Sequence, residues 1–441
     1  MKRVIVVIVA ALAVGCGASP GSDNASKKKA APAATASATP DISKAGNVTL
    51  TVWDQEVRGG QNKQIKQLNQ EFEAKYPNVK IKRVAKSFDD LQTTLKLAVS
   101  GPKAPDVVEA NQGRPIMGAL VKAGMLRPLD DYAKLYGWND RYSSLLLDLN
   151  KFSSDGKEFG SGNLYGLSQM GEIVGLFYNK AKVPNPPKTF ADFQQQVAAA
   201  KAKGEVPISF GNLDKYGGIH EFQTVQNQFA PKQAVRDFVF AKPGASFATS
   251  QNNQAATLIQ QWARKGYFTP NFNGVGYDAA VTKFAKGAGP FLIGGTWLTA
   301  TLVQAMSANV GFMLMPGTAP VSLGGESLPW SITAKSPHPD VAAAYIDFLT
   351  NANAARVLVQ TNNLPAMPTD AQPDNSLSKD VFAAWKTLND AEGLVPYLDY
   401  STPDFYNQIT AAIQELLGGK LSPQAFTKQV QSDYSKFTKT L

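Results

Sequence analysis

The side chains that most often carry catalysis or bind metals are scarce in this chain. Its 441 residues include one cysteine, Cys16, and two histidines, His220 and His338. A single cysteine cannot form an internal disulfide, and two distant histidines without a second sulfur argue against a zinc site. The same scarcity disfavours Cys–His catalysis and a Ser–His–Asp triad. We therefore expect no metal and no cofactor, and we expect both histidines to be surface or hydrogen-bonded structural residues.

Carboxylates are the remaining candidates for acid–base chemistry. Asp54, Glu56, Glu172 and Glu326 lie at strand ends or at junctions of the predicted elements. A glycosidase uses two such groups, one as acid and one as base or nucleophile. Nothing in their spacing selects a pair, however, and a binding site for hydroxyl groups uses the same side chains. An enzyme is therefore kept as an alternative to a binding protein, and we expect no catalysis.

The single cysteine follows a short apolar run near the start of the chain. Lys2 and Arg3 are basic, residues 4–14 form an apolar run of eleven, and Ala13-Val14-Gly15 directly precede Cys16. The run is too short for a permanent transmembrane helix but suits a signal peptide. Small residues before a cysteine at this place resemble the lipobox of bacterial lipoproteins, which implies a signal peptide over 1–16 and lipidation of Cys16. An ordinary secretory signal with an incidental cysteine is the alternative.

The segment after the cysteine has the composition of a linker. Residues 17–46 are mostly Ala, Ser, Thr, Pro, Gly and Lys, with one large apolar side chain, Ile42. Such a stretch buries too little surface to offset the entropy lost on ordering, so we expect a flexible tether. No later segment is a continuous apolar run of 18 residues, which favours a protein anchored to a membrane over one that spans it.

The net charge gives no support to nucleic-acid binding. The formal charge is +9, and removing Lys2 and Arg3 leaves 42 basic and 35 acidic residues, or +7. Lys27, Lys28 and Lys29 carry three of these charges in the linker, and the rest are dispersed. No stripe of Lys and Arg is interleaved with aromatic residues, so we expect a solvated, mildly basic surface and no nucleic-acid partner.

From Val48 onward the hydrophobic pattern alternates between strand and helix. Residues 48–53, 79–84 and 106–110 have the β-branched or alternating pattern of strands. Between them, residues 61–76 and 91–99 place apolar side chains at three- and four-residue spacing, as helices do. This β-α-β-α-β order predicts a parallel sheet with helices on both faces.

A second α/β series begins near Leu164. Its predicted strands cover 173–178, 206–210, 289–294 and 309–315, and its predicted helices cover 190–202 and 255–265. Two such units predict an α/β fold with two lobes that face a cleft. In open α/β sheets, ligands lie beyond the carboxyl ends of the strands.

Short motifs along the chain occur in a familiar order. Leu164-Tyr165-Gly166-Leu167-Ser168 leads to Gly175-Leu176-Phe177-Tyr178-Asn179-Lys180, and Phe284-Ala285-Lys286-Gly287 leads to Gly294-Gly295-Thr296-Trp297. They are preceded by Ala104-Pro105-Asp106-Val107-Val108 and followed by Met315-Pro316-Gly317. In order and spacing, the region from about Val48 to the C-terminus resembles the extracellular solute-binding proteins of carbohydrate ABC importers, which are related in fold to maltose-binding protein.

The resemblance implies a two-lobe periplasmic-binding-protein fold of type II, whose lobes are joined by hinge strands and close on a ligand. Carried over to this chain, lobe 1 covers 47–172 and 323–362, and lobe 2 covers 173–322 and 363–441. The hinge crossings are then expected near 171–173, 315–323 and 361–367.

The resemblance also implies a function. The chain would be a monomeric lipoprotein on the outer face of a bacterial cell membrane that captures a sugar and delivers it to the separate permease subunits of an ABC importer. An aromatic-rich cleft suits a di- or oligosaccharide, because each stacking ring covers one sugar unit. A glycosidase and a surface lipoprotein without a small ligand are the alternatives.

A sugar site needs planar polar groups for hydroxyls, aromatic faces for C–H patches, and burial. Trp297 is the first candidate, because it follows a strand and two glycines where a core tryptophan would be awkward, and because relatives place a stacking aromatic here. Glu172 is the second, since it lies at the first crossing between the lobes. The other candidates are Asn111, Gln112, Arg114, Trp53, Asp54, Glu56, Asn212, Glu326, Tyr400 and Tyr406. Each has a structural role as its alternative; Trp53, for example, could cover the edge of the sheet.

Overall fold

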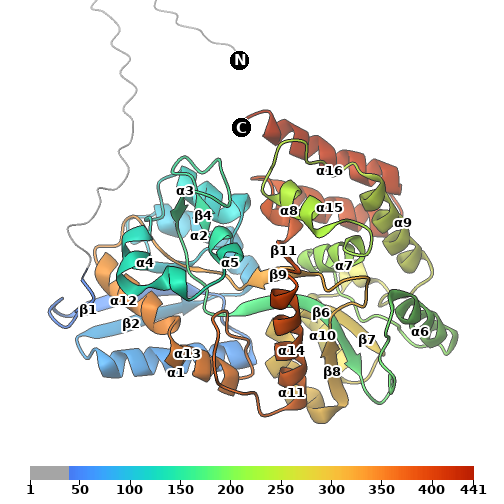
Figure 1. The fold of residues 1–441 in the computed structure, drawn as a ribbon, viewed down its shortest axis with the longest axis horizontal. Coiled ribbons are helices and arrows are strands. Elements are labelled where there is room, and N and C mark those ends of the chain that lie inside the picture. Colours follow the sequence, from blue (N-terminus) through green and yellow to red (C-terminus); the bar gives the residue numbers. More distant parts are fainter. Residues whose placement is uncertain (1–38) are drawn as a thin grey trace, which may run out of the picture. The chain divides into compact units, whose positions relative to one another are not determined.

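The structure is a computed structural model in which residues 39–441 are described (Figure 1). The predicted signal peptide, Cys16 and most of the predicted tether lie outside the described residues. Within residues 39–46, the chain is already packed: the Ile42 side chain is 1 % exposed, and the Asn78 amide donates hydrogen bonds to the carbonyls of Ile42 and Gly46. The packed part of the chain therefore includes Ile42, within the predicted tether 17–46, because its side chain lies in the core.

The first sheet has the strand order β10-β3-β1-β2. Strands β1 (Val48–Asp54), β2 (Val79–Ala85) and β3 (Val107–Glu109) are parallel, and β10 (Trp330–Ile332) runs antiparallel to β3. Helices α1 (Gly59–Lys75) and α2 (Phe88–Ser100) connect the parallel strands. The predicted β-α-β-α-β unit is confirmed.

The second sheet is mostly antiparallel. Strand β6 (Gly171–Asn179) lies at its centre and runs antiparallel to β7 (Phe291–Gly295), β8 (Val310–Met313) and β9 (Ser322–Glu326). Strand β11 (Leu394–Val395) extends the sheet in parallel with β9. A small hairpin pairs β4 (Lys151–Phe152) with β5 (Asn163–Leu164).

The predicted strand at 206–210 is wrong. Only Ile208 makes bridges there, to Phe268 and Phe291. Pro207 has no N–H to donate, so a continuous ladder cannot form on both sides of it. The apolar side chains of Ile208 and Phe210 are nevertheless buried in the core, without forming a strand.

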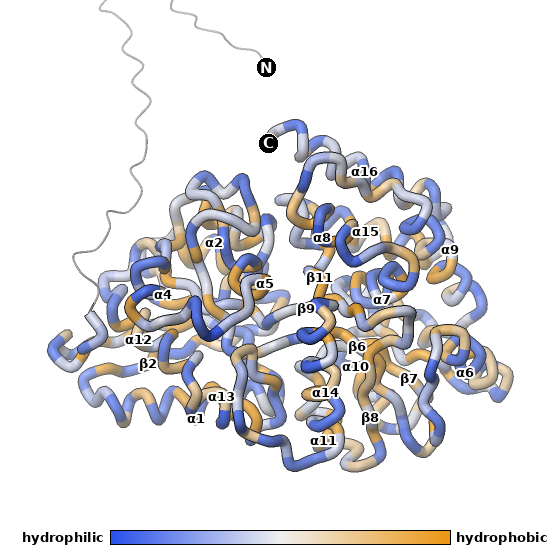
Figure 2. Tube along the Cα trace, viewed as in Figure 1, coloured by the Kyte–Doolittle hydropathy of each residue, from blue (hydrophilic) through white to orange (hydrophobic). Residues whose placement is uncertain are grey.

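Helices cover both sheets, as the alternating pattern predicts. Those packed around the first sheet and the hairpin are α3 (Ala119–Lys122), α4 (Asp130–Tyr136), α5 (Ser144–Asp148), α12 (Pro339–Leu349) and α13 (Ala352–Gln360). Those grouped with the second sheet are α6 (Phe190–Ala202), α7 (Tyr216–Gln226), α8 (Lys232–Val239), α9 (Ser250–Arg264), α10 (Tyr277–Ala285), α11 (Thr299–Met306), α14 (Ser376–Asp390), α15 (Phe405–Leu417) and α16 (Pro423–Thr438). Figure 2 shows hydrophobic colour along β7 and β8 and mixed colour along outer helices such as α1 and α16. No helix in the described part of the chain is long and apolar enough to span a bilayer.

The chain passes between the two sheets at neighbouring places. The start of β6 pairs with the end of β9, with Glu172 opposite Gly325. The chain then leaves β9 in the second sheet and enters β10 in the first at residues 327–329, just after the expected range 315–323. A third connection follows α13, where the Gly171 N–H donates to the Leu364 carbonyl at 2.8 Å. The crossings are thus adjacent in space, and the lobe boundaries given above stay a prediction.

Candidate ligand-binding site

A cavity of about 650 Å³, partly open to solvent, is lined by residues from elements of both sheets. Gln55 and Asn111 reach it from the carboxyl ends of β1 and β3, where ligands of α/β sheets bind. Its lining comprises Gln55, Arg58, Gln61, Phe88, Asn111, Glu172, Tyr216, Ile219, His220, Trp297, Glu326, Leu328, Tyr397, Asp399, Tyr400 and Tyr406. Its mixture of rings and polar groups is typical of small-molecule sites.

Six of the twelve residues predicted from the sequence line this cavity. They are Asn111, Glu172, Trp297, Glu326, Tyr400 and Tyr406. These residues are spread over almost 300 positions of the sequence. Glu172 and Glu326 lie in β6 and β9, Asn111 and Trp297 shortly follow β3 and β7, and Tyr400 and Tyr406 lie in η6 (Leu398–Tyr400) and α15. The fold therefore brings together half of the predicted set.

Trp297 occupies the turn η4 (Thr296–Leu298) that directly follows β7. It is half-buried, and its ring covers the backbone of Gly295 so closely that a Cβ there would lie 1.9 Å from a ring atom. The imidazole of His220 packs beside it, with 5.3 Å between ring centroids. Gly295 is thus what allows the indole to fold back over the strand end and line the cavity.

Three carboxylates line the cavity, and burial raises the pKa of each. The pKa of Glu172, in β6, and that of Glu326, in β9, rise to about 8, and the pKa of Asp399 rises to about 7. Glu56 and Glu326 raise the pKa of Glu172 further, because their negative charges disfavour its ionisation. Near neutral pH, Glu172 and Glu326 are therefore mostly protonated, and Asp399 is partly protonated.

Amide and phenol groups connect the two sides of the cavity. The Tyr400 hydroxyl donates to the Gln112 side-chain oxygen at 3.2 Å and contacts that of Asn111 at 3.5 Å. The Gln112 amide nitrogen donates to the Ser327 carbonyl at 2.7 Å and contacts Glu326 at 3.5 Å. Gln112 itself does not line the cavity; it positions Tyr400 and Glu326, which do.

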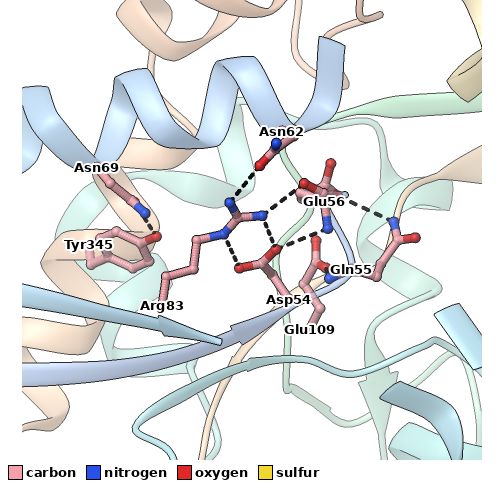
Figure 3. Close-up of polar contacts among 8 residues, drawn as sticks. All are labelled: Asp54, Gln55, Glu56, Asn62, Asn69, Arg83, Glu109 and Tyr345. Atoms are coloured by element: carbon pink, nitrogen blue, oxygen red, sulfur yellow. Dashed lines mark hydrogen bonds and ion pairs between the residues drawn. The ribbon is translucent and has the colours of Figure 1, made fainter. Parts of the chain in front are cut away.

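Asp54 and Glu56 lie behind the cavity wall in a buried polar cluster (Figure 3). Asp54 accepts two hydrogen bonds of 2.6 Å from Arg83, a bidentate ion pair. Burial raises the pKa of Glu56 to about 7. Between them, Gln55 donates its backbone N–H to Glu109 at 2.6 Å and its side-chain amide to Glu56 at 3.3 Å. Of the two predicted carboxylates, Glu56 therefore contacts Gln55 and Asp54 does not, and Gln55 is the residue of this strand end that lines the cavity.

Trp53, Arg114 and Asn212 also lie away from the cavity. Trp53 is half-buried, with the Lys86 ammonium 4.8 Å from the centre of its ring. Arg114 donates to the backbone carbonyls of Val239 at 2.9 Å and Ser401 at 2.6 Å. Asn212 accepts a hydrogen bond from the Gly218 N–H at 3.0 Å. Each side chain has structural partners that account for its position.

Residues 67–413 match the family model of bacterial extracellular solute-binding proteins. This span is well over half of the chain.

The chain belongs to this family.

Curated relatives and solved structures agree with the match. The solute-binding protein is 23% identical to the multiple sugar-binding protein of Streptococcus mutans, over 76% of this chain and 78% of the relative. It is 26% identical to a maltodextrin-binding protein of Bacillus subtilis, over 68% and 70% of the two chains. Among solved structures it resembles a chitin oligosaccharide binding protein (TM-score 0.77, 23% identity, 89% and 99% of the two chains) and a raffinose complex of RafE (0.68, 19%, 89% and 100%). The expected two-lobe fold is confirmed.

Several lining residues of the solute-binding protein escaped the sequence analysis. His220, expected at the surface or in a structural hydrogen bond, is buried in the cavity wall, and its Nδ1 atom has no partner among the described residues. Burial lowers its pKa to about 3, so the ring is neutral. Tyr397 and Asp399 were not predicted either. They alternate with the apolar Leu398 just before the predicted Tyr400, and this alternation could have placed both of them on the same side as the site. Gln55 was missed as well, although it lies in the sequence between Asp54 and Glu56, which were both predicted to contact the ligand.

Proposed function

We propose that this solute-binding protein captures a sugar outside the cytoplasm and delivers it to the permease subunits of an ABC importer. The observation that carries the proposal is a cavity that combines aromatic rings with buried polar groups drawn from both lobes. Rings such as Trp297 and Tyr406 offer faces for the C–H patches of a sugar. The names of the relatives, which include multiple-sugar and maltodextrin binding, support the same class of ligand.

Polar groups that are left unpaired in the cavity wall support a ligand rich in hydroxyls. Both the nitrogen and the oxygen of the Gln61 side-chain amide are buried without a hydrogen-bond partner among the described residues, as is Nδ1 of His220. Leaving such groups unsatisfied costs about 1–3 kcal/mol each. Hydroxyl groups can serve as donor and acceptor at once, so a sugar would satisfy them.

We propose a di- or oligosaccharide, since several rings line the cavity and one pyranose stacks on only one or two. The contact residues in this proposal are Asn111, Glu172, Trp297, Glu326, Tyr400 and Tyr406, joined by Gln55, Gln61, His220, Tyr397 and Asp399. Asp54, Glu56, Gln112, Arg114, Asn212 and Trp53 are then positioning or structural residues. We further propose that a lipid on Cys16 holds the monomeric receptor at the outer face of the cell membrane.

Calorimetry with a panel of gluco-, xylo-, malto- and chito-oligosaccharides tests this function. Saturable binding of at least one sugar, with that sugar recovered unchanged after prolonged incubation, is the expected result. Cleavage of the sugar would instead favour the glycosidase alternative. Absence of binding across the whole panel would contradict the proposal.

A further inference from the structure

The charged groups that line the cavity are unbalanced. Glu172, Glu326 and Asp399 are acidic, and Arg58 is the one basic side chain in the lining among the described residues. The Arg58 guanidinium bonds to other residues: it forms an ion pair with Asp278 at 3.2 Å and donates a hydrogen bond to the Tyr216 hydroxyl at 3.4 Å. It lowers the pKa of Glu172 but forms no hydrogen bond with it. The three carboxylates therefore lack a cation of their own.

Two of these carboxylates have no partner from another residue in the described part of the chain. Glu172 and Asp399 are each 8 % exposed; Glu172 makes no side-chain hydrogen bond or ion pair there, and Asp399 has only its own backbone N–H as a partner. Glu326 differs, because it accepts hydrogen bonds from Asn150 and Gln112. A buried carboxylate is costly unless it is paired or protonated. Glu172 and Asp399 are thus the groups in this cavity that a ligand's positive charge would satisfy.

Aromatic rings surround the same two carboxylates. Tyr397 lines the same cavity as Glu172 and Asp399, and the charges of both acids raise the pKa of its phenol. The neutral imidazole of His220 links the Tyr397 ring, 5.6 Å away, to the Trp297 ring, 5.3 Å away. Ring faces attract a desolvated ammonium group, and carboxylates supply its counter-charge. A neutral sugar would use the rings but would give the two carboxyl groups no positive charge that favours their ionised form.

From this juxtaposition we infer that the preferred ligand is a basic sugar, one that carries a protonated amine bound between Glu172 and Asp399 among the rings of Tyr397 and Trp297. The inference rests on the proposed sugar-receptor function and narrows it to a substrate class. The amine would donate hydrogen bonds to both carboxylates, and the remaining hydroxyls would use Gln55, Gln61 and Asn111.

A matched set of ligands tests the inference in the full chain. Three β-1,4-linked glucose disaccharides are compared by calorimetry, with hydroxyl, amine or N-acetyl groups at carbon 2 of each ring, beside the three corresponding monosaccharides. Hydrogen bonds to charged groups are stronger than neutral ones by roughly 1–1.5 kcal/mol, so the amine form should bind about five- to tenfold more tightly than its partners. The Glu172→Gln and Asp399→Asn variants should each lose most of this preference, which is measured in each variant as the ratio of its affinities for the amine form and the hydroxyl form.

Asp131→Asn is the control variant. It removes one negative charge from an exposed position on α4, so it tests whether net charge alone produces the effect, and it should keep the full preference. If a neutral disaccharide, or a neutral sugar of the wider panel, binds as tightly as the amine forms, the inference is overturned while the receptor function stands. If the preference survives in both cavity variants, the assignment to Glu172 and Asp399 is wrong. If no sugar binds, both proposals fall together.

Discussion

Trp297 is the residue on which the proposed sugar site most depends. A stacking tryptophan buries about 150–250 Å², and at about 25 cal/mol per Å² its loss should remove a few kcal/mol of binding. We expect Trp297→Ala to weaken sugar binding roughly a hundredfold, since each 1.4 kcal/mol is about tenfold in affinity. Because the ring is half-buried at a cavity wall, the unliganded protein should melt at nearly the wild-type temperature.

Trp262→Ala is the matched control. Trp262 is buried on α9 and packs edge-on against Phe193, with ring centroids 5.8 Å apart. Removing it should cost about 3–5 kcal/mol of stability with little change in affinity for the folded fraction. A Trp297 variant that melts as early as the Trp262 variant, yet binds normally, would show that Trp297 is a core residue.

The buried acids should make the unliganded protein less stable as the pH rises. In the folded state, the pKa values of Glu172 and Glu326 are about 8, well above the ordinary value of 4.5. Between these values the folded state holds protons that the unfolded state has released, so the free energy of unfolding falls with rising pH. We expect this loss of stability between about pH 4.5 and 8. The melting temperature, measured across this pH range, checks it. Glu172→Gln should flatten the curve, and an unchanged slope would contradict the raised pKa.

At the scale of single residues, sequence reasoning found side chains by type and by their place at strand ends. Glu172, Trp297 and Tyr400 could be found in this way. The structural role of the end of β1 could not, because Arg83, which pairs with Asp54, lies 29 positions further along the chain, and Glu109, which accepts from the Gln55 N–H, lies 54 positions from Gln55. His220 could not be found either, since nothing local distinguishes a cavity histidine from a structural one.

At the scale of elements, the close pairing of β6 with β9 requires a glycine at position 324 of β9. Gly324 has φ +132°, and a Cβ there would lie 2.2 Å from the Glu172 carbonyl oxygen on β6. Gly324→Ala should therefore destabilise the protein by more than the 1–3 kcal/mol or so of backbone strain alone, and it should displace Glu172. Gly204→Ala is the control, because Gly204 has φ +79° but open space around it. Equal losses in chemical denaturation would mean that the contact with β6 does not matter.

The elements themselves were largely predictable. The first sheet follows from the β-branched runs and the one-sided helices between them, which local sequence encodes. Antiparallel pairing of β6 with three strands could not be read from the sequence, because buried strands have similar apolar runs in either direction. The strand expected at 206–210 failed at Pro207, where a missing N–H outweighs an apolar pattern.

At the scale of the whole molecule, the N-terminal cysteine predicts where the receptor resides. If Ala13-Val14-Gly15-Cys16 is a lipobox, Cys16→Ala should move the protein from the membrane fraction to the soluble fraction or the medium. Immunoblots of fractionated cells measure this, with Cys16→Ser as a second variant that also lacks the acceptor thiol. Retention of both variants at the membrane, equal to wild type, would argue against lipid anchoring.

Contacts at the mouth of the cavity indicate how the two lobes meet. Arg58, just before α1 in the first lobe, pairs with Asp278 on α10 in the second, 220 positions away. Phe88 on α2 packs against Tyr216 on α7, with ring centroids 5.7 Å apart. Such contacts exist only when the lobes are close, so a ligand that touches both lobes should favour this closed arrangement over an open one.

We therefore expect small-angle scattering to show a smaller radius of gyration when a binding sugar is added. Asp278 is 69% exposed, so its ion pair with Arg58 should contribute no more than about 1 kcal/mol. Asp278→Asn should then lower the affinity by about fivefold at most, chiefly through faster dissociation, and the variant should still contract at saturating sugar. If the wild-type scattering curve is unchanged at saturation, the lobes do not close on the ligand. If Asp278→Asn abolishes contraction, the ion pair stabilises the closed arrangement more strongly than an exposed pair should. The contacts with the sugar would then be too weak to close the lobes by themselves.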